Sequence, residues 1–201
     1  EFLKNSTSTI FQLKTAKEGS PTNEAPIFTI TGQNPTNIAL TKNFLNSFEK
    51  EDLRKLYWIK SSSNDNWFFS SKYKQINTLA SSSEYSIIFR LPEIILIRAE
   101  AYINTNKKNE AISDINSIRN KAGLNGISSS NENLFEAILN ERQHELFCEH
   151  GNRWFDLKRF GLLSQTLLPL KPSFHDFHQY FPIPESELIL NQNLLPQNQG
   201  Y

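Results

Sequence analysis

Residues 90–102 read RLPEIILIRAEAY and decide the fold of the chain. Together with Ile87, the apolar side chains of this stretch recur at intervals of three and four residues, at Ile87, Leu91, Ile94, Ile95, Ala99 and Tyr102. That spacing gathers them on one face of an α-helix. Pro92 is tolerated in the first turn, where its missing N–H needs no partner, and Glu93 suits the positive end of the helix dipole. The sequence therefore predicts an amphipathic helix that begins near Leu91.

Three more helices are predicted after this one. A polar turn at residues 104–109 leads into a second helix, whose apolar positions are Ala111, Ile112, Ile115 and Ile118. Gly123 can end that helix in a left-handed conformation. Polar residues 128–131 have the character of an N-cap, and we expect the third helix that they start to end at Gly151. A short fourth helix, residues 153–160, is expected to end at a further glycine, Gly161.

The first two helices have the spacing of a tetratricopeptide-type hairpin, in which small residues let two antiparallel helices approach closely. Arg98 stands where that repeat usually carries an apolar residue. Only one clear unit is present, although a solenoid needs at least about three. The predicted fold is mainly α, with tetratricopeptide-like helical hairpins, long irregular loops and a few short strands.

Residues 1–86 differ in character from residues 87–201. The first segment is rich in Ser, Thr and Asn, and it predicts short strands at residues 10–13 and 27–30 and helical spacing over residues 43–56. The second segment carries the helices and then a proline-rich tail with several aromatic residues. We expect this tail to wrap over the helices, and the two segments to form one compact domain.

The composition argues against several classes of protein. The 201 residues include 21 Lys and Arg against 21 Asp and Glu, so the formal charge is zero at pH 7. Binding to nucleic acid or to an anionic membrane draws on a basic excess that this chain lacks. No run of 18 apolar residues is present, and the single Cys148 cannot form an intrachain disulfide. Because the chain has no methionine, we expect it to be a processed product or a piece of a longer protein.

Residues 140–159 concentrate charges and aromatic rings. Glu141, Glu145 and Glu149 are four residues apart, so they share one helix face, whereas the two carboxylates of a glycosidase face each other across a sugar. We expect these glutamates to form partly buried ion pairs with nearby arginines that hold the third helix against the fourth. The candidate arginines are Arg142, Arg153 and Arg159.

Two histidine clusters offer alternatives. His144, Cys148 and His150 could share a metal ion, but a zinc site needs three or four ligands and no closing ligand is evident. His175 and His178 form a second cluster of the kind that can serve acid–base chemistry, yet histidines in such a segment more often bind backbone carbonyls or water. The sequence has no glycine-rich phosphate loop, nucleophile elbow or Cys-x-x-Cys pair. We therefore predict no catalytic residue, no metal and no cofactor.

Aromatic residues flank a polar turn at residues 61–66, SSSNDN. Exposed aromatic rings stack on the C–H faces of sugars, while neighbouring polar groups hydrogen-bond to the sugar hydroxyls. The alternative interpretation is that these aromatic residues fill a core. The predicted ligand-binding residues are Trp58, Trp67, Phe68, Asn64, Asp65 and Asn66.

Five stretches follow one another along the second segment: residues 90–101, 111–123 with IRNKAG, 141–159, 180–187 with YFPIPESE, and 191–201. In order and spacing they resemble the SusD/RagB family, and this resemblance covers residues 87–201. More weakly, residues 9–13 and the pair Lys72 and Tyr73 look like the more variable region that precedes these motifs in the family.

The resemblance implies a surface lipoprotein of the outer membrane in Bacteroidota-type bacteria, built on tetratricopeptide-like hairpins. Such proteins bind glycans, or peptides in the RagB branch, and form a lid over a SusC-like TonB-dependent transporter. This chain would be the C-terminal portion, and its only link to the membrane would be a lipid anchor on an upstream segment. The shared motifs fall on the helical scaffold, so the family supplies no ligand-binding residue directly. By position and composition, the loop around Trp58 and Trp67 is the nearest equivalent of the family's sugar-binding loops.

The expected function is therefore capture of a glycan or oligosaccharide for uptake, without catalysis. Capture of peptides, as in the RagB branch, is the first alternative. A tetratricopeptide module that binds only protein would not respond to glycans. A glycosidase or a metal-dependent hydrolase would release product from a polysaccharide or retain metal through dialysis.

Overall fold

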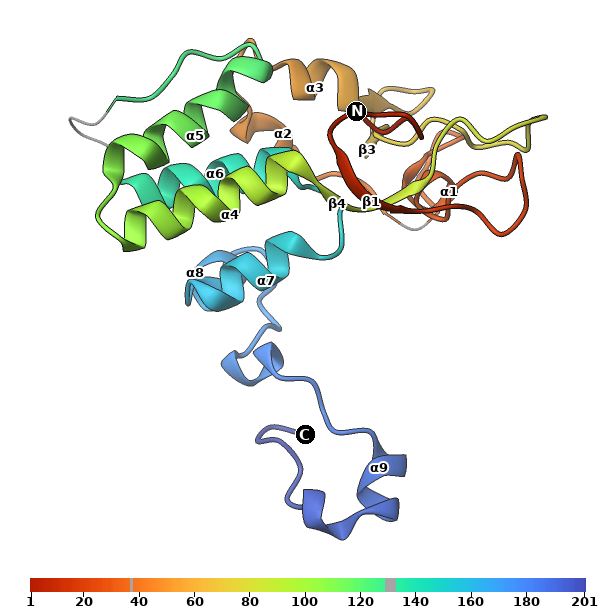
Figure 1. Ribbon diagram of the computed structural model, residues 1–201. Coiled ribbons are helices and arrows are strands. Elements are labelled where there is room, and N and C mark those ends of the chain that lie inside the picture. Colours follow the sequence, from red (N-terminus) through yellow and green to blue (C-terminus); the bar gives the residue numbers. More distant parts are fainter. Residues whose placement is uncertain (37, 129–132) are drawn as a thin grey trace. The chain divides into compact units, whose positions relative to one another are not determined.

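The structure is a computed structural model that describes residues 1–36, 38–128 and 133–201 (Figure 1). It divides into two compact units, Glu1–His150 and Gly151–Tyr201. The first unit holds β1 (Thr9–Leu13), α1 (Glu24–Phe28), α2 (Lys42–Ser47), α3 (Leu53–Trp58), β2 (Ile59–Ser61), β3 (Phe68–Ser70), β4 (Ser86–Arg90), α4 (Leu91–Asn104), α5 (Lys108–Lys121) and α6 (Leu134–Glu145). The second unit holds α7 (Asn152–Arg159), α8 (Leu163–Leu167), the 3-10 helix η1 (Asp176–Gln179), α9 (Glu185–Leu190) and the 3-10 helix η2 (Gln192–Leu194).

The mainly α fold with few, short strands that the sequence predicts is confirmed. The segment boundary at residues 86 and 87 falls within β4, and the division of the chain at that point stays a prediction. In the part of the chain that the structure describes, no helix combines the length and the apolar character needed to cross a bilayer.

Helices α4, α5 and α6 form the helical core of the first unit. Figure 1 shows α4 and α5 side by side and antiparallel, with α6 alongside them. Ala99, Ile115 and Ile138 come from the three helices in turn, and each has a relative exposure of 0%. Burying an isoleucine side chain stabilises a fold by roughly 1.5–3 kcal/mol. The small Ala99 lets the three helices approach at this point.

The predicted start of α4 and the predicted end of α5 are confirmed, whereas α5 begins at Lys108, inside the predicted polar turn. Pro92 lies in the first turn of α4, as its missing N–H requires. Gly123 follows α5 with a φ of 77°, and Leu124 N donates to Arg119 O at 2.9 Å, which satisfies a carbonyl at the helix end. Arg98, at the position where an apolar residue is usual, forms a two-pronged ion pair with Asp114 of α5 at 2.7 and 2.8 Å.

Helix α6 differs from the prediction at both ends. Its N-cap is Asn133, whose side chain accepts hydrogen bonds from the next turn, while residues 129–131 of the predicted cap lie outside the described residues. The helix ends at Glu145 and not at Gly151. Lys72 Nζ donates to the carbonyl oxygens of Glu145 and Phe147 at 2.6 and 3.0 Å. These hydrogen bonds satisfy carbonyl groups that would otherwise lack a donor at the end of the helix. The helix can therefore end at Glu145, before Gly151.

The turn after α6 is built from left-handed residues. Cys148 has a φ of 58°, His150 of 45° and Gly151 of 70°. Such values are costly for residues with a side chain, so surrounding contacts must hold them. His150 Nε2 lies 2.9 Å from Ile87 O, a contact of this kind.

The N-terminal half of the first unit contains two small antiparallel sheets. Strand β1 pairs with β4, which confirms the strand predicted at residues 10–13. Strand β2 pairs with β3, with Ile59 opposite Ser70 and Ser61 opposite Phe68. The second pair forms a hairpin that carries most of the predicted ligand-binding residues.

Two local predictions in this half are wrong or incomplete. Residues 27–30 do not form a strand, because helix α1 runs through Phe28 with Pro26 in its first turn and Ala25 buried. The helical spacing over residues 43–56 is divided between α2 and α3. Asp52 provides the reason, since its side chain accepts a hydrogen bond from Arg54 N at 2.9 Å and starts a new helix.

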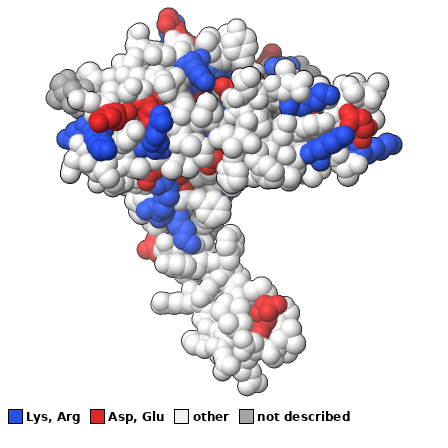
Figure 2. Space-filling model, viewed as in Figure 1, with Lys and Arg blue, Asp and Glu red and all other residues white. Residues whose placement is uncertain are grey.

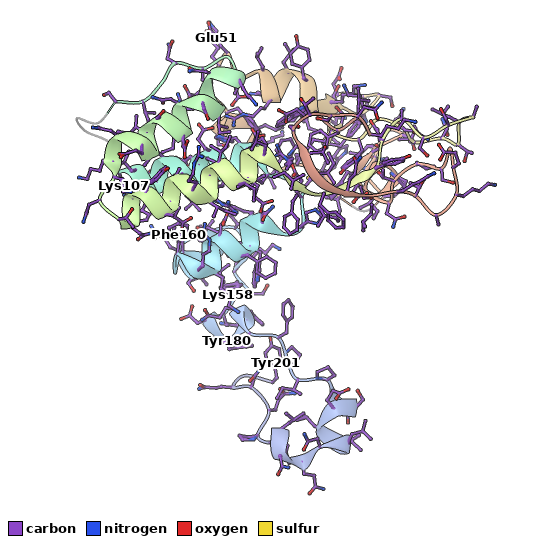
Figure 3. All side chains as sticks on the ribbon, viewed as in Figure 1. Glu51, Lys107, Lys158, Phe160, Tyr180 and Tyr201 are labelled. Carbon is purple, nitrogen blue, oxygen red and sulfur yellow. The ribbon has the colours of Figure 1, made fainter. Side chains whose placement is uncertain are left out.

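The second unit has its own small apolar cluster of Leu157, Leu163 and Phe174. Short helices interrupt the segment that the sequence predicts as an extended tail. Lys158 Nζ lies 4.9 Å from the ring centre of Tyr180, and Figure 3 shows these two side chains near each other. A cation over an aromatic face is attracted by the negative charge of that face.

Candidate functional site

The β2–β3 hairpin is closed by a tight turn at residues 62–67, which we call the hairpin turn. Ser62 N donates to Trp67 O at 2.8 Å, and Ser62 Oγ donates to Asn64 Oδ1 at 2.8 Å. Asn66 N donates to the same Asn64 oxygen at 3.2 Å. Asp65 adopts a left-handed φ of 56°, a conformation that Asp tolerates better than most residues. The local hydrogen bonds therefore hold the turn in one shape.

Trp67 is the exposed aromatic residue of the hairpin turn. The residue is 42% exposed, and its indole Nε1 donates to Asn34 Oδ1 at 3.3 Å. This bond restricts the ring while leaving much of its surface to solvent. Phe68, the next residue, is half-buried, and its carbonyl accepts a hydrogen bond from Leu40 N at 2.7 Å. The structure thus brings Trp67 and Phe68 together with the polar residues of the turn.

The polar side chains of the hairpin turn already make internal hydrogen bonds. Asp65 Oδ1 accepts from Ser61 Oγ, and Asn64 Oδ1 accepts from Ser62 and Asn66. A carboxylate has further acceptor sites and an amide has two N–H donors, so both side chains keep bonding capacity for a ligand. Both residues are exposed, as is Asn66.

Trp58 has different surroundings. It ends α3 at the base of the hairpin, where its carbonyl accepts from Ser71 N at 2.7 Å. Its half-buried ring packs edge-on against Phe2 with ring centres 5.7 Å apart, and Lys72 Nζ lies 4.8 Å from its ring centre. The structure therefore places Trp58 beside the core and away from the turn that carries Trp67. Its role as a ligand-binding residue stays a prediction.

An open groove of about 850 Å³ lies beside the hairpin, between α2, α3 and the two strands. Leu45, Ile59 and Phe68 supply apolar surface in this groove, and Asn46 and Ser61 supply polar groups. Of the predicted site residues, Phe68 alone is among the residues that line it. Sequence reasoning missed the groove because its walls come from separate elements, although apolar residues alternating with lysines over residues 42–60 were a signal.

A series of buried ion pairs connects α6 to other elements of the first unit. Its members, each joined to the next, are Lys72, Glu149, Arg90, Glu145, Arg54, Glu141 and Arg119, and we call them the buried ion-pair chain. The N···O distances are 2.5 to 2.9 Å, apart from 3.4 Å between Arg54 and Glu145. Asp52, the N-cap of α3, joins the chain through Arg54 at 2.7 Å.

The buried ion-pair chain changes the predicted role of the three glutamates. Glu141, Glu145 and Glu149 do form buried ion pairs, but the cations that the structure gives them come from α3, α5, β4 and the loop after β3. These partners connect α6 to the elements that carry the hairpin and the groove. The buried ion-pair chain therefore holds the elements that carry the candidate site, and Asp52, which joins it, also lines the groove.

Electrostatics keep the carboxylate of Glu149 ionised. Burial acts to raise the pKa of Glu149, but the positive charges of Lys72 and Arg90 outweigh it and leave the pKa below its ordinary value of 4.5. Burial raises the pKa of the neighbouring Cys148 thiol to about 11, so this thiol stays protonated at neutral pH. A protonated thiol is neither a nucleophile nor a metal ligand.

The residues considered for catalysis or metal binding have structural partners. His144 Nε2 lies 2.9 Å from Ser47 Oγ, and its ring centre is 4.4 Å from that of Phe48. In the second unit, His178 Nδ1 accepts from His175 N at 2.8 Å. Within residues 1–36, 38–128 and 133–201, no three His, Cys, Asp or Glu side chains are grouped so that they could hold a metal ion.

Comparison with known proteins extends the description. SusD-like protein P2 from Formosa agariphila is 32% identical over 139 residues, which make up 62% of this chain and 27% of that protein. A SusD superfamily protein from Bacteroides vulgatus has a similar structure, with a TM-score of 0.76 at 23% identity over 98% of this chain and 52% of its own. Surface glycan-binding protein A from Bacteroides thetaiotaomicron, solved in complex with laminarihexaose, matches with a TM-score of 0.64 at 20% identity over 89% of this chain and 45% of its own.

The chain spans about a quarter of the length of the curated relatives and about half of that of the first solved structures. The solved structures share its fold at identities below 25%. A sequence model of the SusD family matches residues 49–201, which include the hairpin, most of the groove and all of α4 to α6. Because this match covers well over half of the chain, the protein belongs to the SusD family.

Proposed function

We propose that this protein binds a glycan at the cell surface as part of a nutrient-uptake system and catalyses no reaction itself. Membership of the SusD family supports the proposal. The observation that carries it is Trp67, a residue that is 42% exposed at the end of a turn held by its own hydrogen bonds. An exposed large aromatic surface next to polar side chains is typical of a binding site.

The hairpin turn provides the two kinds of contact that a sugar needs. The face of Trp67 stacks on the C–H face of a sugar ring, and Asn64, Asp65 and Asn66 hydrogen-bond to its hydroxyl groups. The turn is already ordered by Ser62, so little conformational entropy is lost on binding. Phe68 extends the apolar contact from the turn into the groove.

Absence of catalysis is supported by the state of the carboxylates. A glycosidase needs two carboxyl groups that reach the same glycosidic bond. The carboxylates of Glu141, Glu145 and Glu149 instead form ion pairs with arginines and with a lysine. The candidate histidines also bond to neighbouring protein groups.

The binding role belongs to a larger assembly in this proposal. The full-length protein is held at the outer membrane by a lipid anchor on a segment upstream of this chain, and it delivers its glycan to a SusC-like TonB-dependent transporter. Delivery requires release, so we expect modest affinity, with closure of the protein over the transporter retaining the ligand.

The proposal is tested by affinity electrophoresis of the full-length protein through gels that contain plant, algal and animal polysaccharides. Trp67→Ala and Trp58→Ala are measured separately, because the two rings have different surroundings. Phe155→Ala, which removes an aromatic ring that is 60% exposed in the second unit, is the matched control. We expect at least one polysaccharide to retard the protein, with retardation lost in Trp67→Ala and kept in Phe155→Ala.

Two results would contradict the proposal in different ways. Unchanged retardation of Trp67→Ala would show that the hairpin turn is not the binding site. Failure of every polysaccharide to retard the protein would overturn glycan capture and favour the peptide-binding alternative, which a peptide panel on the same protein would then test.

A further inference from the structure

The groove beside the hairpin gathers four lysines. Lys42 begins α2, Lys50 lies in the loop before α3, Lys55 lies in α3 and Lys60 in β2. All four are exposed. Among the described residues, none of them has an ion-pair partner, whereas Lys14 and Lys72 both do. Several exposed charges of one sign around a groove raise the local positive potential, and this potential attracts an anionic ligand.

The nearby carboxylates compensate these lysines only in part, and the exposed one at the edge of the groove is Asp65, which accepts a hydrogen bond from the groove residue Ser61. Asp52 is the only acidic residue among the described residues that line the groove, and it is buried and held by Arg54 at 2.7 Å. Glu49 pairs with Arg119 at 2.7 Å. Glu51 does not line the groove, and Figure 3 shows its side chain projecting outward at the edge of the first unit. The groove therefore carries an excess of positive charge.

This local excess contrasts with the chain as a whole. The protein has equal numbers of basic and acidic residues, and on the face of the first unit seen in Figure 2 the two signs lie close together. The local excess of positive charge therefore arises because α2, the loop before α3, α3 and β2 each place one lysine at the same groove. A concave surface lined by one sign of charge concentrates ligands of the opposite sign.

We propose that this groove binds a polyanionic glycan, a polysaccharide chain that carries sulfate or carboxylate groups. The inference rests on the proposed function and names the class of glycan. Leu45, Ile59 and Phe68 offer apolar surface for the C–H faces of sugar rings, while the lysines bind the anionic substituents. Phe68 and Ser61 connect the groove to the hairpin turn, since Ser61 also bonds to Asp65. One extended chain of sugars can therefore contact both places.

Lysine suits this ligand. Its ammonium is a compact charge with three donors on a flexible stem, so it follows anionic groups at variable positions without the fixed geometry that arginine imposes. Attraction between exposed charges is modest for each pair and is screened by salt, with a Debye length of about 8 Å at 0.15 M. Binding through four lysines should therefore be strongly dependent on ionic strength, whereas stacking on Trp67 should not.

The test compares four glycans on the full-length protein by affinity electrophoresis and calorimetry: carrageenan, which is sulfated, polygalacturonate, which is carboxylated, and the neutral polymers laminarin and dextran. The groove variant replaces Lys42, Lys50, Lys55 and Lys60 by glutamine. The control variant removes the same charge from exposed lysines outside the groove, namely Lys17, Lys74, Lys107 and Lys108.

We expect one of the two anionic polymers to bind, and which of them binds tells sulfate from carboxylate recognition. Its dissociation constant should rise about tenfold in the groove variant and less than about twofold in the control. Raising NaCl to 0.5 M should weaken binding of the natural protein by a similar factor. If thermal unfolding shows that a quadruple variant is misfolded, the pairs Lys55→Gln with Lys60→Gln and Lys107→Gln with Lys108→Gln give the same comparison.

The outcomes separate this inference from the proposed function. Binding of laminarin or dextran without either anionic polymer would overturn the inference and leave glycan capture standing. Equal affinity of the groove and control variants for an anionic polymer would show that the groove is not its site. Tighter binding of polyglutamate than of any glycan would assign the groove to acidic peptides, and no binding of any glycan would overturn both proposals.

Discussion

Arg54 and Glu141 form an ion pair of 2.8 Å between α3 and α6, and both side chains are almost completely buried. Arg54 also binds Asp52 at 2.7 Å and Glu145 at 3.4 Å, so one guanidinium serves three carboxylates. Taking these charges out of water is costly, and their mutual attraction repays the cost only while every partner is present. Helix α3, which carries part of the groove, is therefore held to α6 by an ion pair whose disruption should strongly destabilise the fold.

Replacing Arg54 by leucine should be among the most destabilising single changes in this protein. It leaves the carboxylates of Asp52, Glu141 and Glu145 buried without their shared cation. Breaking a buried ion pair in this way costs about 3–5 kcal/mol. Urea denaturation followed by circular dichroism measures the change in the free energy of unfolding.

Arg98→Leu is the matched control for this prediction. Arg98 also forms a two-pronged ion pair, with Asp114, but its side chain is 57% exposed. Solvent screens an exposed pair and rehydrates the partner that remains. We expect Arg98→Leu to lower the free energy of unfolding by only a small part of the loss seen for Arg54→Leu. Equal losses would show that burial does not determine how much an ion pair contributes to stability.

Glu149 should make the protein sensitive to acid. Burial would raise its pKa, but Lys72 and Arg90 hold it below the ordinary value of 4.5. As the pH falls, Glu149 is therefore protonated in the unfolded chain at a higher pH than in the folded protein. The resulting stabilisation is complete above about pH 4.5 and is lost as the pH drops toward the pKa of the folded state.

Unfolding of the natural protein and of Glu149→Gln between pH 7 and pH 3 measures this effect. We expect the natural protein to be more stable at pH 7 and the difference between the two to shrink toward pH 3, because glutamine does not titrate. A difference that stays constant over this range would mean that Glu149 is not the group responsible.

Replacing Trp58 by alanine should lower the free energy of unfolding more than replacing Trp67. Trp58→Ala removes a ring that packs on Phe2 and lies under Lys72, and truncation of a packed aromatic costs about 3 kcal/mol. Trp67→Ala removes a ring that is 42% exposed, and surface changes of this kind usually cost less than about 1 kcal/mol. Urea denaturation of both variants checks the difference. Similar losses would place Trp67 in the packed structure and weaken its assignment to ligand binding.

Gly123 should resist substitution. Its φ is 77°, and a methyl group there would lie 3.0 Å from two side-chain carbons of Leu53. Gly123→Ala should therefore lower the free energy of unfolding by about 1–2 kcal/mol. Gly32→Ala is the control, since nothing lies within 4 Å of its added carbon, and we expect a change within about 0.5 kcal/mol. A thermal unfolding series with equal shifts for both variants would contradict the prediction.

Sequence reasoning succeeded where one local signal decides the structure. Pro92 and Gly123 mark helix ends through their own backbone chemistry, so the limits of α4 and α5 could be predicted within a few residues. It failed where a distant residue decides. The end of α6 depends on Lys72, which is far away in the sequence and binds the last carbonyls of the helix. The strand predicted at residues 27–30 is replaced in part by α1, because Pro26 lies in the first turn of this helix, where its missing N–H is tolerated.

The candidate site could be predicted only in part for the same reason. The hairpin turn is local in sequence, and its residues Asn64 to Trp67 do lie together with Phe68, the first residue of β3. The groove is assembled from separate elements, α2, α3 and the two strands, and α3 is held to α6 by the ion pair of Arg54 with Glu141, which are 87 residues apart. The sequence contains the four groove lysines, but nothing in their spacing predicts that they share one surface.

The three tryptophans of the chain occupy three different environments, so each can serve as an intrinsic fluorescence probe of a different part of the protein. Trp58 lies beside cations near the core, Trp67 faces solvent on the hairpin, and Trp154 packs against the apolar cluster of the second unit. Indole emission depends on polarity and on nearby charge. A variant that keeps only Trp67 would register the arrival of a sugar by a change in fluorescence, and one that keeps only Trp154 would follow melting of the second unit without an attached dye.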